Sequence, residues 1–76
     1  MEVKDFIENF ALIFDETDPA ELTTDTVFRD LDEWSSLTAL GLIAVIEEEY
    51  EVELNSKDLE NSITVGDIYD IVKTKK

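Results

Sequence analysis

Two adjacent hydroxyl side chains, Ser35 and Ser36, are the groups in this chain best placed to take part in chemistry. They follow Trp34 and open a stretch that runs apolar for three turns and closes on the glutamates at 47–49. Serine is common at the start of a helix, where its hydroxyl accepts a hydrogen bond from an unpaired backbone N–H group. The pair therefore has two interpretations: both serines merely begin a helix, or one of the two hydroxyls is presented for modification.

The composition excludes most catalytic machinery. The chain has no histidine and no cysteine, so Ser–His and Cys–His catalysis, histidine or thiolate metal sites and disulfides are all excluded within it. The acids at 15–18 and 30–33 lack the alternating oxygen ligands, central glycine and terminal glutamate of a calcium loop. We interpret paired acids such as Asp32 and Glu33 as loop charges. The sequence predicts a protein that is not an enzyme and has no dedicated metal site.

The stretch from Ser36 to Tyr50 is predicted to form one helix, with Ser35 as its N-cap. At about 100° per residue, one arc carries the side chains expected in the core: Ala39, Leu42, Ile43, Ile46 and Tyr50. The opposite arc is apolar near the serines, small in the middle and acidic toward the end: Leu37, Leu40, Gly41, Ala44, Glu47 and Glu48. A helix that only supported a core would be expected to carry polar residues on that second arc.

This stretch resembles the second helix of the acyl carrier proteins. In that family an Asp-Ser-Leu motif begins the helix, and an acidic run followed by an aromatic residue ends it. Here Ser36-Leu37 is followed at the corresponding distance by Glu-Glu-Glu-Tyr at 47–50. The resemblance extends to Phe-Arg-Asp-Leu at 28–31, Val-Glu-Leu at 52–54 and Ile-Thr-Val-Gly-Asp at 63–67, with no insertion between Phe28 and Val72.

The resemblance implies a carrier function for the chain. Ser36 would accept a phosphopantetheine arm from coenzyme A through a separate magnesium-dependent phosphopantetheinyl transferase. The arm would hold acyl or related groups as thioesters for separate enzymes of fatty-acid, polyketide or other specialised biosynthesis. A phosphodiester at the first turn of a helix would also face unpaired N–H groups and the positive end of the helix dipole. A growing acyl chain is expected to enter a space bounded by Phe28, Leu42 and Ile46.

The resemblance and the shared helix face together give the candidate partner-binding residues: Leu37, Leu40, Gly41, Ala44, Glu47 and Glu48. The expected partners are the transferase and acyl-transferring or condensing enzymes with basic docking surfaces. The chain departs from the family at Ser35, where the family has aspartate, and at Gly41, which is often acidic in relatives. The departure at Ser35 favours the alternative hypothesis, an unmodified acidic adaptor that docks a partner protein through this helix.

The formal net charge of −14, from 20 acidic and 6 basic residues, restricts the classes of partner. Nucleic acids and anionic membrane surfaces are disfavoured, because binding them requires cationic groups on the protein. A strongly negative field instead attracts basic protein surfaces. With 76 residues, no apolar run long enough to span a membrane and no signal-peptide pattern, we expect a single domain over residues 1–76 that is monomeric and cytoplasmic.

The rest of the chain predicts an all-α bundle. Apolar residues at helical spacing indicate a first helix from Met1 to Phe14, and a long connection follows at 17–33, with a short helical turn possible at 17–22. Asn55 or Ser56 is expected to begin a short helix that ends at Asn61, and Thr64 a final helix with Asp67 in a capping box. The predicted fold is a small acyl-carrier-like bundle of three main helices and one short helix.

Overall fold

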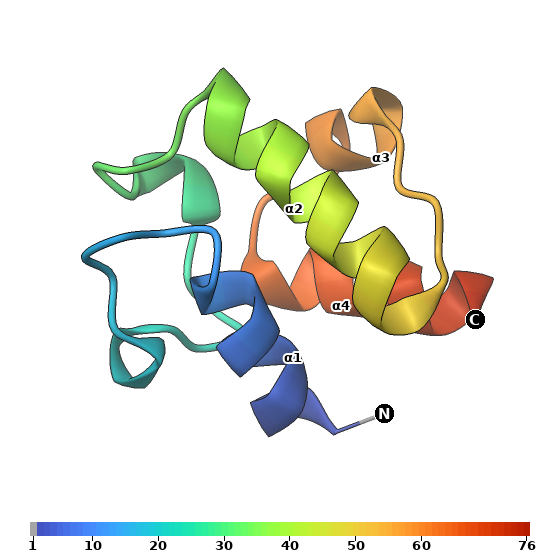
Figure 1. Cartoon of the computed structure of the whole chain (residues 1–76), viewed down its shortest axis with the longest axis horizontal. Coiled ribbons are helices and arrows are strands. Elements are labelled where there is room, and N and C mark those ends of the chain that lie inside the picture. The colour runs from blue at the N-terminus through green and yellow to red at the C-terminus, as the bar shows by residue number, and fades with distance from the viewer. Residues whose placement is uncertain (1) are drawn as a thin grey trace.

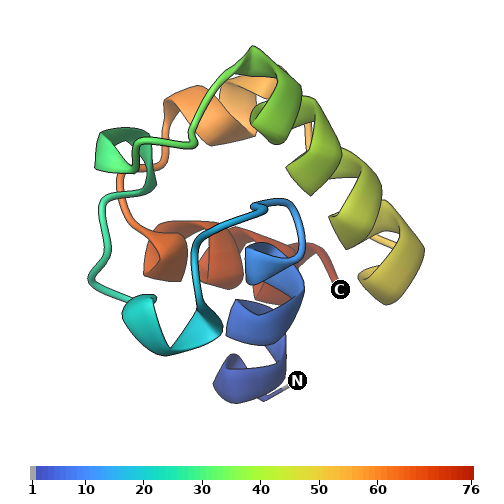
Figure 2. The ribbon, with the colours of Figure 1, turned by 60° about the vertical axis from the view of Figure 1, so that its left-hand side comes forward.

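A computed structural model, which describes residues 2–76, shows four α-helices and two short 3₁₀ helices. The helices are α1 (Val3–Ala11), α2 (Ser36–Tyr50), α3 (Ser56–Glu60) and α4 (Val65–Lys75). The 3₁₀ helices, η1 (Pro19–Glu21) and η2 (Phe28–Asp30), interrupt the long connection from α1 to α2. α1, α2 and α4 enclose the centre of the molecule, while α3 lies beside the first half of α2 (Figures 1 and 2). The predicted all-α fold is confirmed.

Aromatic residues form the centre of the core. Phe6 and Phe10 on α1 are fully buried, and Phe28 on η2 is fully buried as well. The ring centroids of Phe10 and Phe28 are 6.3 Å apart, within the range of favourable edge-to-face contact. The aliphatic part of the core comes from α2, α4 and the connection before α3: Leu42, Ile46, Val52, Leu54, Val65, Ile68 and Val72. The aromatic stripe of the first helix is thus core.

The first helix is shorter than predicted. We expected a helix from Met1 to Phe14; Met1 lies outside the described residues, and the α-helix ends at Ala11. The next three amides bond three residues back, and Phe14 N–H donates to the Ala11 carbonyl at 3.0 Å. This tighter turn brings Phe14 into the core and leaves Leu12 exposed. Helical spacing correctly predicted that Phe6, Phe10, Ala11 and Phe14 are buried, but Val3, at the start of the same stripe, is exposed. The spacing did not predict the change of helix type.

The long connection is fastened to the start of α4. Val27 and Thr64 form an isolated antiparallel bridge, and the Gly66 N–H donates to the Thr24 carbonyl at 2.9 Å. A Cβ atom at Gly66 would lie 2.9 Å from that carbonyl oxygen, so this close approach requires glycine. Leu22 and Phe28, which belong to this connection, are buried in the core. The loop that leads to the serines therefore has a fixed path.

Side-chain caps define where α3 and α4 begin. Asn55 and Asp58 form a capping box at α3, and Thr64 and Asp67 form the predicted one at α4. The Ile63 and Thr64 backbone N–H groups donate to the Asp67 carboxylate and lower the pKa of that group.

Across residues 2–76 no helix combines the length and apolar character needed to cross a membrane.

Candidate functional site

The two serines have different structural roles. Ser35 is the N-cap of α2: its Oγ accepts from the Thr38 N–H at 3.3 Å, and its own N–H donates to Thr38 Oγ1 at 2.6 Å. Ser36 is the first residue of the helix and is exposed. The capping box therefore occupies the Ser35 hydroxyl, while the Ser36 hydroxyl stands at the surface.

The start of α2 is suited to an anionic group. The first amides of a helix have no intrahelical acceptor, and the Ser35 side chain serves the amide of Thr38. The amides of Ser36 and Leu37 consequently add their partial positive charge beside the Ser36 hydroxyl. A phosphate ester on this hydroxyl would be stabilised by the N-terminus of a 15-residue helix.

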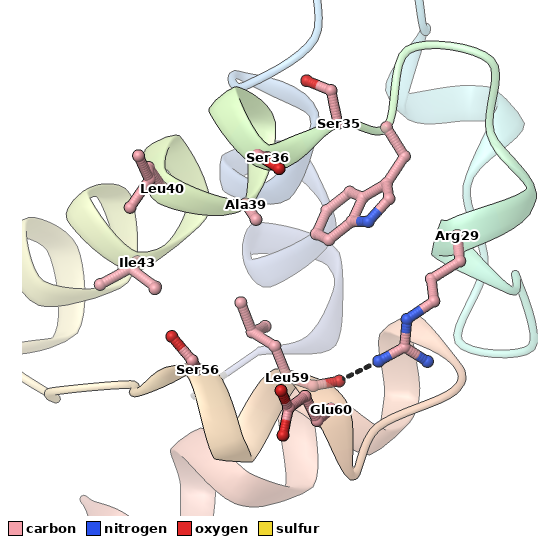
Figure 3. A pocket seen from close by; sticks show the side chains of 10 residues that line it. Arg29, Ser35, Ser36, Ala39, Leu40, Ile43, Ser56, Leu59 and Glu60 are labelled. Carbon is pink, nitrogen blue, oxygen red and sulfur yellow. Dashed lines mark hydrogen bonds between the residues drawn. The ribbon is translucent and has the colours of Figure 1, made fainter.

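A pocket of about 590 Å³ opens beside Ser36. Figure 3 shows it between α2 and α3, with Ile43 on one wall, Leu59 facing it and Arg29 at one end. The complete lining is Arg29, Trp34, Ser35, Ser36, Ala39, Leu40, Ile43, Ser56, Leu59 and Glu60. Phe28, Leu42 and Ile46, which we expected to bound a space for the acyl chain, are fully buried in the core and do not line this pocket. The pocket that an attached group could enter lies nearer the surface, between α2 and α3.

Trp34 takes part in both the core and the pocket. Its ring packs edge-on against Phe28, with centroids 4.6 Å apart, and it also lines the pocket. The core contact fixes the orientation of the indole. Trp34 thus anchors the loop before α2 and forms part of the pocket wall.

The second arc of α2 forms an exposed face next to Ser36. Leu37 and Leu40 are 78% and 64% exposed, large values for apolar side chains. Ala44, Glu47 and Glu48 are exposed further along the helix. Gly41 differs from these five, because Ile13 lies 3.6 Å from the position its Cβ would take and half-buries it. The face is apolar beside the hydroxyl and acidic at its far end.

Comparison with known proteins identifies the arrangement. Residues 5–72 match the family model described as a phosphopantetheine attachment site. The chain also resembles the solution NMR structure of a holo acyl carrier protein from Geobacter metallireducens, with 32% sequence identity and a TM-score of 0.79. That match covers 99% of this chain and 86% of the other. The chain belongs to the acyl carrier protein family.

Membership confirms the expected prosthetic group of this carrier, a covalently attached phosphopantetheine. The residues present fit that group, because an exposed hydroxyl stands beside free helix amides and an open pocket. When bound, the group supplies a thiol on a flexible arm. Carriers of this type present intermediates to other enzymes and are not catalytic themselves, in line with the expected absence of enzyme activity.

Two residues that position the carrier's site were missed by sequence reasoning. One is Glu33, which we interpreted as a loop charge. Its carboxylate accepts from the Asp15 and Glu16 backbone N–H groups, both at 3.0 Å, and from the Thr17 hydroxyl at 2.6 Å. The Thr17 hydroxyl, followed by these amides, lowers the pKa of Glu33. Glu33 thereby ties the segment before the serines to the end of α1.

The other missed residue is Arg29. Its Nη1 donates to the Ser62 carbonyl at 2.7 Å, and its Nη2 donates to the Leu59 carbonyl. Lys75 forms a 2.6 Å ion pair with Asp58 of α3 and also binds the Glu53 carbonyl at 3.0 Å. This ion pair lowers the pKa of Asp58. Two cations, Arg29 and Lys75, therefore hold α3 and with it one wall of the pocket.

Proposed function

We propose that the chain carries acyl or related intermediates as thioesters on a phosphopantetheine arm at Ser36 and delivers them to separate biosynthetic enzymes. The observation that carries this proposal is the division of roles between the serines. The cap engages Ser35, whereas Ser36 has an exposed hydroxyl at the helix start and beside the pocket. We place the carrier in the cytoplasm, as a single monomeric domain.

The transfer step makes modest demands on this chain. Ser36 Oγ forms a bond to the phosphorus atom of coenzyme A that bears the pantetheine group, and the pyrophosphate bond of coenzyme A breaks to release adenosine 3′,5′-bisphosphate. The hydroxyl proton goes to a base of the transferase, because the carrier contains no histidine or cysteine beside the serine. The carrier's own contribution is to fix the hydroxyl on a rigid helix and to stabilise the resulting negative charge.

The second arc of α2 is the proposed docking surface, and it comprises the half-buried Gly41 and five exposed residues: Leu37, Leu40, Ala44, Glu47 and Glu48. The leucines would pack against an apolar patch of the transferase or of an acyl-transferring or condensing enzyme. The glutamates would attract basic side chains at its edge. Exposed ion pairs of this kind give rapid, weak and salt-sensitive contacts, which suit a carrier that visits several enzymes in turn.

The experiment is a labelling reaction with coenzyme A, magnesium and a broad-specificity transferase, read by intact mass. The wild-type chain should gain one phosphopantetheine unit. Ser36→Ala should gain none, while remaining folded. Ser35→Ala should still be labelled, although loss of its cap should lower the free energy of unfolding by about 1 kcal/mol.

A carrier of known activity in the same reaction shows that the transferase is working. Failure of the wild-type chain to gain mass beside that control would reject the carrier proposal. It would favour the unmodified adaptor, for which the replacement of the family aspartate by Ser35 is the supporting feature.

A further inference from the structure

Arg29 is a fixed positive charge in the wall of the pocket. Its guanidinium donates to the carbonyls of Leu59 and Ser62 and lies 5.1 Å from the centroid of the Phe28 ring. Two hydrogen bonds and a cation–π contact thus hold it in place. A cation held in this way loses little conformational entropy when it binds an anion.

The charge and part of the hydrogen-bonding capacity of Arg29 remain available. A guanidinium has five N–H donors, and two of them serve the carbonyls. Within the described part of the chain the ion pair is Lys75–Asp58, so Arg29 is not neutralised by a carboxylate. Glu60 also lines the pocket, but its exposed side chain at the end of α3 has no comparable anchors. The fixed charge in the pocket is therefore positive.

The other walls suit a short carbon chain. Trp34, Ala39, Ile43 and Leu59 give the pocket apolar sides, and Ser36, the proposed attachment point, stands at its edge. A cargo returned to this pocket by its flexible arm would place its carbon atoms against these sides. Its far end would then meet polar groups, with Arg29 among them.

We propose that the cargo of this carrier is an acyl group with a terminal carboxylate, and that Arg29 determines this specificity. This inference depends on the proposed function, because the cargo must be attached through Ser36. Arg29 would bind the distal carboxylate with its remaining N–H donors, in a charge-assisted hydrogen bond. A neutral acyl group of the same length would fill the apolar part of the pocket and leave Arg29 unpaired.

Because the protein is strongly negative, the direction in which an anionic cargo changes the stability of the fold tests this proposal. An additional carboxylate on a chain of net charge −14 should destabilise the fold through repulsion. A carboxylate bound by Arg29 should instead stabilise the fold. The two cases therefore predict opposite shifts in melting temperature when a neutral cargo is exchanged for an anionic cargo.

The test loads Ser36 with either a succinyl or a butyryl arm, by supplying the transferase with the corresponding coenzyme A thioester. Both cargoes have four carbons, and only succinyl ends in a carboxylate. At low salt the succinyl form should melt about 4 °C above the butyryl form, the size expected for one partly exposed charge pair in a small domain. The Arg29 Nε–H resonance should shift in the succinyl form alone, and 0.5 M NaCl should shrink the difference in melting temperature.

Variants separate cargo recognition from the structural role of Arg29. Arg29→Met should lower the melting temperature of both loaded forms, since it removes the two hydrogen bonds that hold the end of α3. It should also remove the advantage of succinyl over butyryl, that is, the difference in melting temperature between the two forms. Arg29→Lys should retain part of that advantage, because it keeps the charge without the planar donor set.

The outcomes distinguish the two proposals. If mass spectrometry confirms both cargoes on Ser36 and the wild-type succinyl form melts at or below the butyryl form, the inference about the cargo is overturned and the carrier function stands. If the advantage of succinyl persists unchanged in Arg29→Met, the carboxylate is bound elsewhere and Arg29 is not the specificity residue. If neither cargo can be loaded, the carrier function itself fails.

Discussion

The two faces of α2 contain similar apolar residues, yet the rest of the chain covers only one of them. Leu42 and Ile46 are fully buried against α1, α4 and the connecting segments, whereas Leu37 and Leu40 are largely exposed. Folding explains the first face, because its burial supplies hydrophobic stabilisation. It does not explain the second, on which polar residues would improve solubility at no cost to the core. We therefore propose that the second face is used outside the fold, in docking to partner proteins.

The sharpest test of this difference is one leucine-to-alanine change on each face. Leu42→Ala should lower the free energy of unfolding by about 2–5 kcal/mol, because it leaves a cavity in the core. Leu40→Ala, the same chemical change on the same helix, should alter it by no more than about 0.5 kcal/mol. Urea denaturation measures both values. Equal losses would mean that Leu40 is packed in solution and that the two faces do not differ.

Two glycines extend the comparison to backbone packing. Gly41→Ala should stabilise the chain by about 1 kcal/mol, because alanine favours a helix interior and its Cβ would meet Ile13 at an ordinary 3.6 Å. Gly66→Ala should destabilise it by about 1–3 kcal/mol, because its Cβ would press on the Thr24 carbonyl oxygen. Thermal unfolding should show the opposite signs. A stabilised Gly66→Ala would show that the loop before η2 is not fixed there.

The acidic end of the exposed face can be tested through the rate at which the transferase modifies the chain. The double substitution Glu47→Gln and Glu48→Gln should lower kcat/KM for the transferase by about three- to tenfold at low salt and leave the fold intact. Glu49→Gln is the matched control, since it removes the same kind of charge on the same exposed run but lies outside the second arc. If the effect of Glu49→Gln is as large per charge removed as that of the double substitution, overall charge, and not this face, guides docking.

The smallest expected effect is a pH dependence of stability from the carboxylates that fasten loops. Hydrogen bonds lower the pKa of Glu33 and of Asp67 in the folded chain below their ordinary values of 4.5 and 3.8. The unfolded chain therefore takes up protons first as the pH falls, so stability should decline below about pH 4.5 and continue to decline through the lowered pKa values. Glu33→Gln and Asp67→Asn should each flatten this decline in urea midpoints measured from pH 6 to pH 3. An unchanged slope in both variants would show that other groups govern acid unfolding.

Sequence reasoning succeeded where the determinants are local. The bounds of α2, its cap at Ser35 and the capping box at Thr64 all depend on residues within one helical turn of each other, and the structure confirms them. The alternation of apolar and polar residues likewise predicted the core stripes of the helices.

It failed where the partners are distant in the chain. Arg29 contacts carbonyls 30 and 33 residues away, and Glu33 contacts amides 17 and 18 residues away. No spacing rule connects such positions, so Glu33 was interpreted as a loop charge and Arg29 was given no structural role. The location of the pocket could not be predicted either, because α3 must first be placed by Arg29 and Lys75.

The most direct test of the central claim is to determine which hydroxyl of the wild-type chain is modified. After labelling with coenzyme A and a transferase, electron-transfer fragmentation of the peptide that contains Trp34, Ser35 and Ser36 assigns the added mass to a single residue. We predict that all of it is on Ser36. Modification of Ser35, or of neither serine beside an active control carrier, would contradict the assignment of one serine to the helix cap and the other to the cargo.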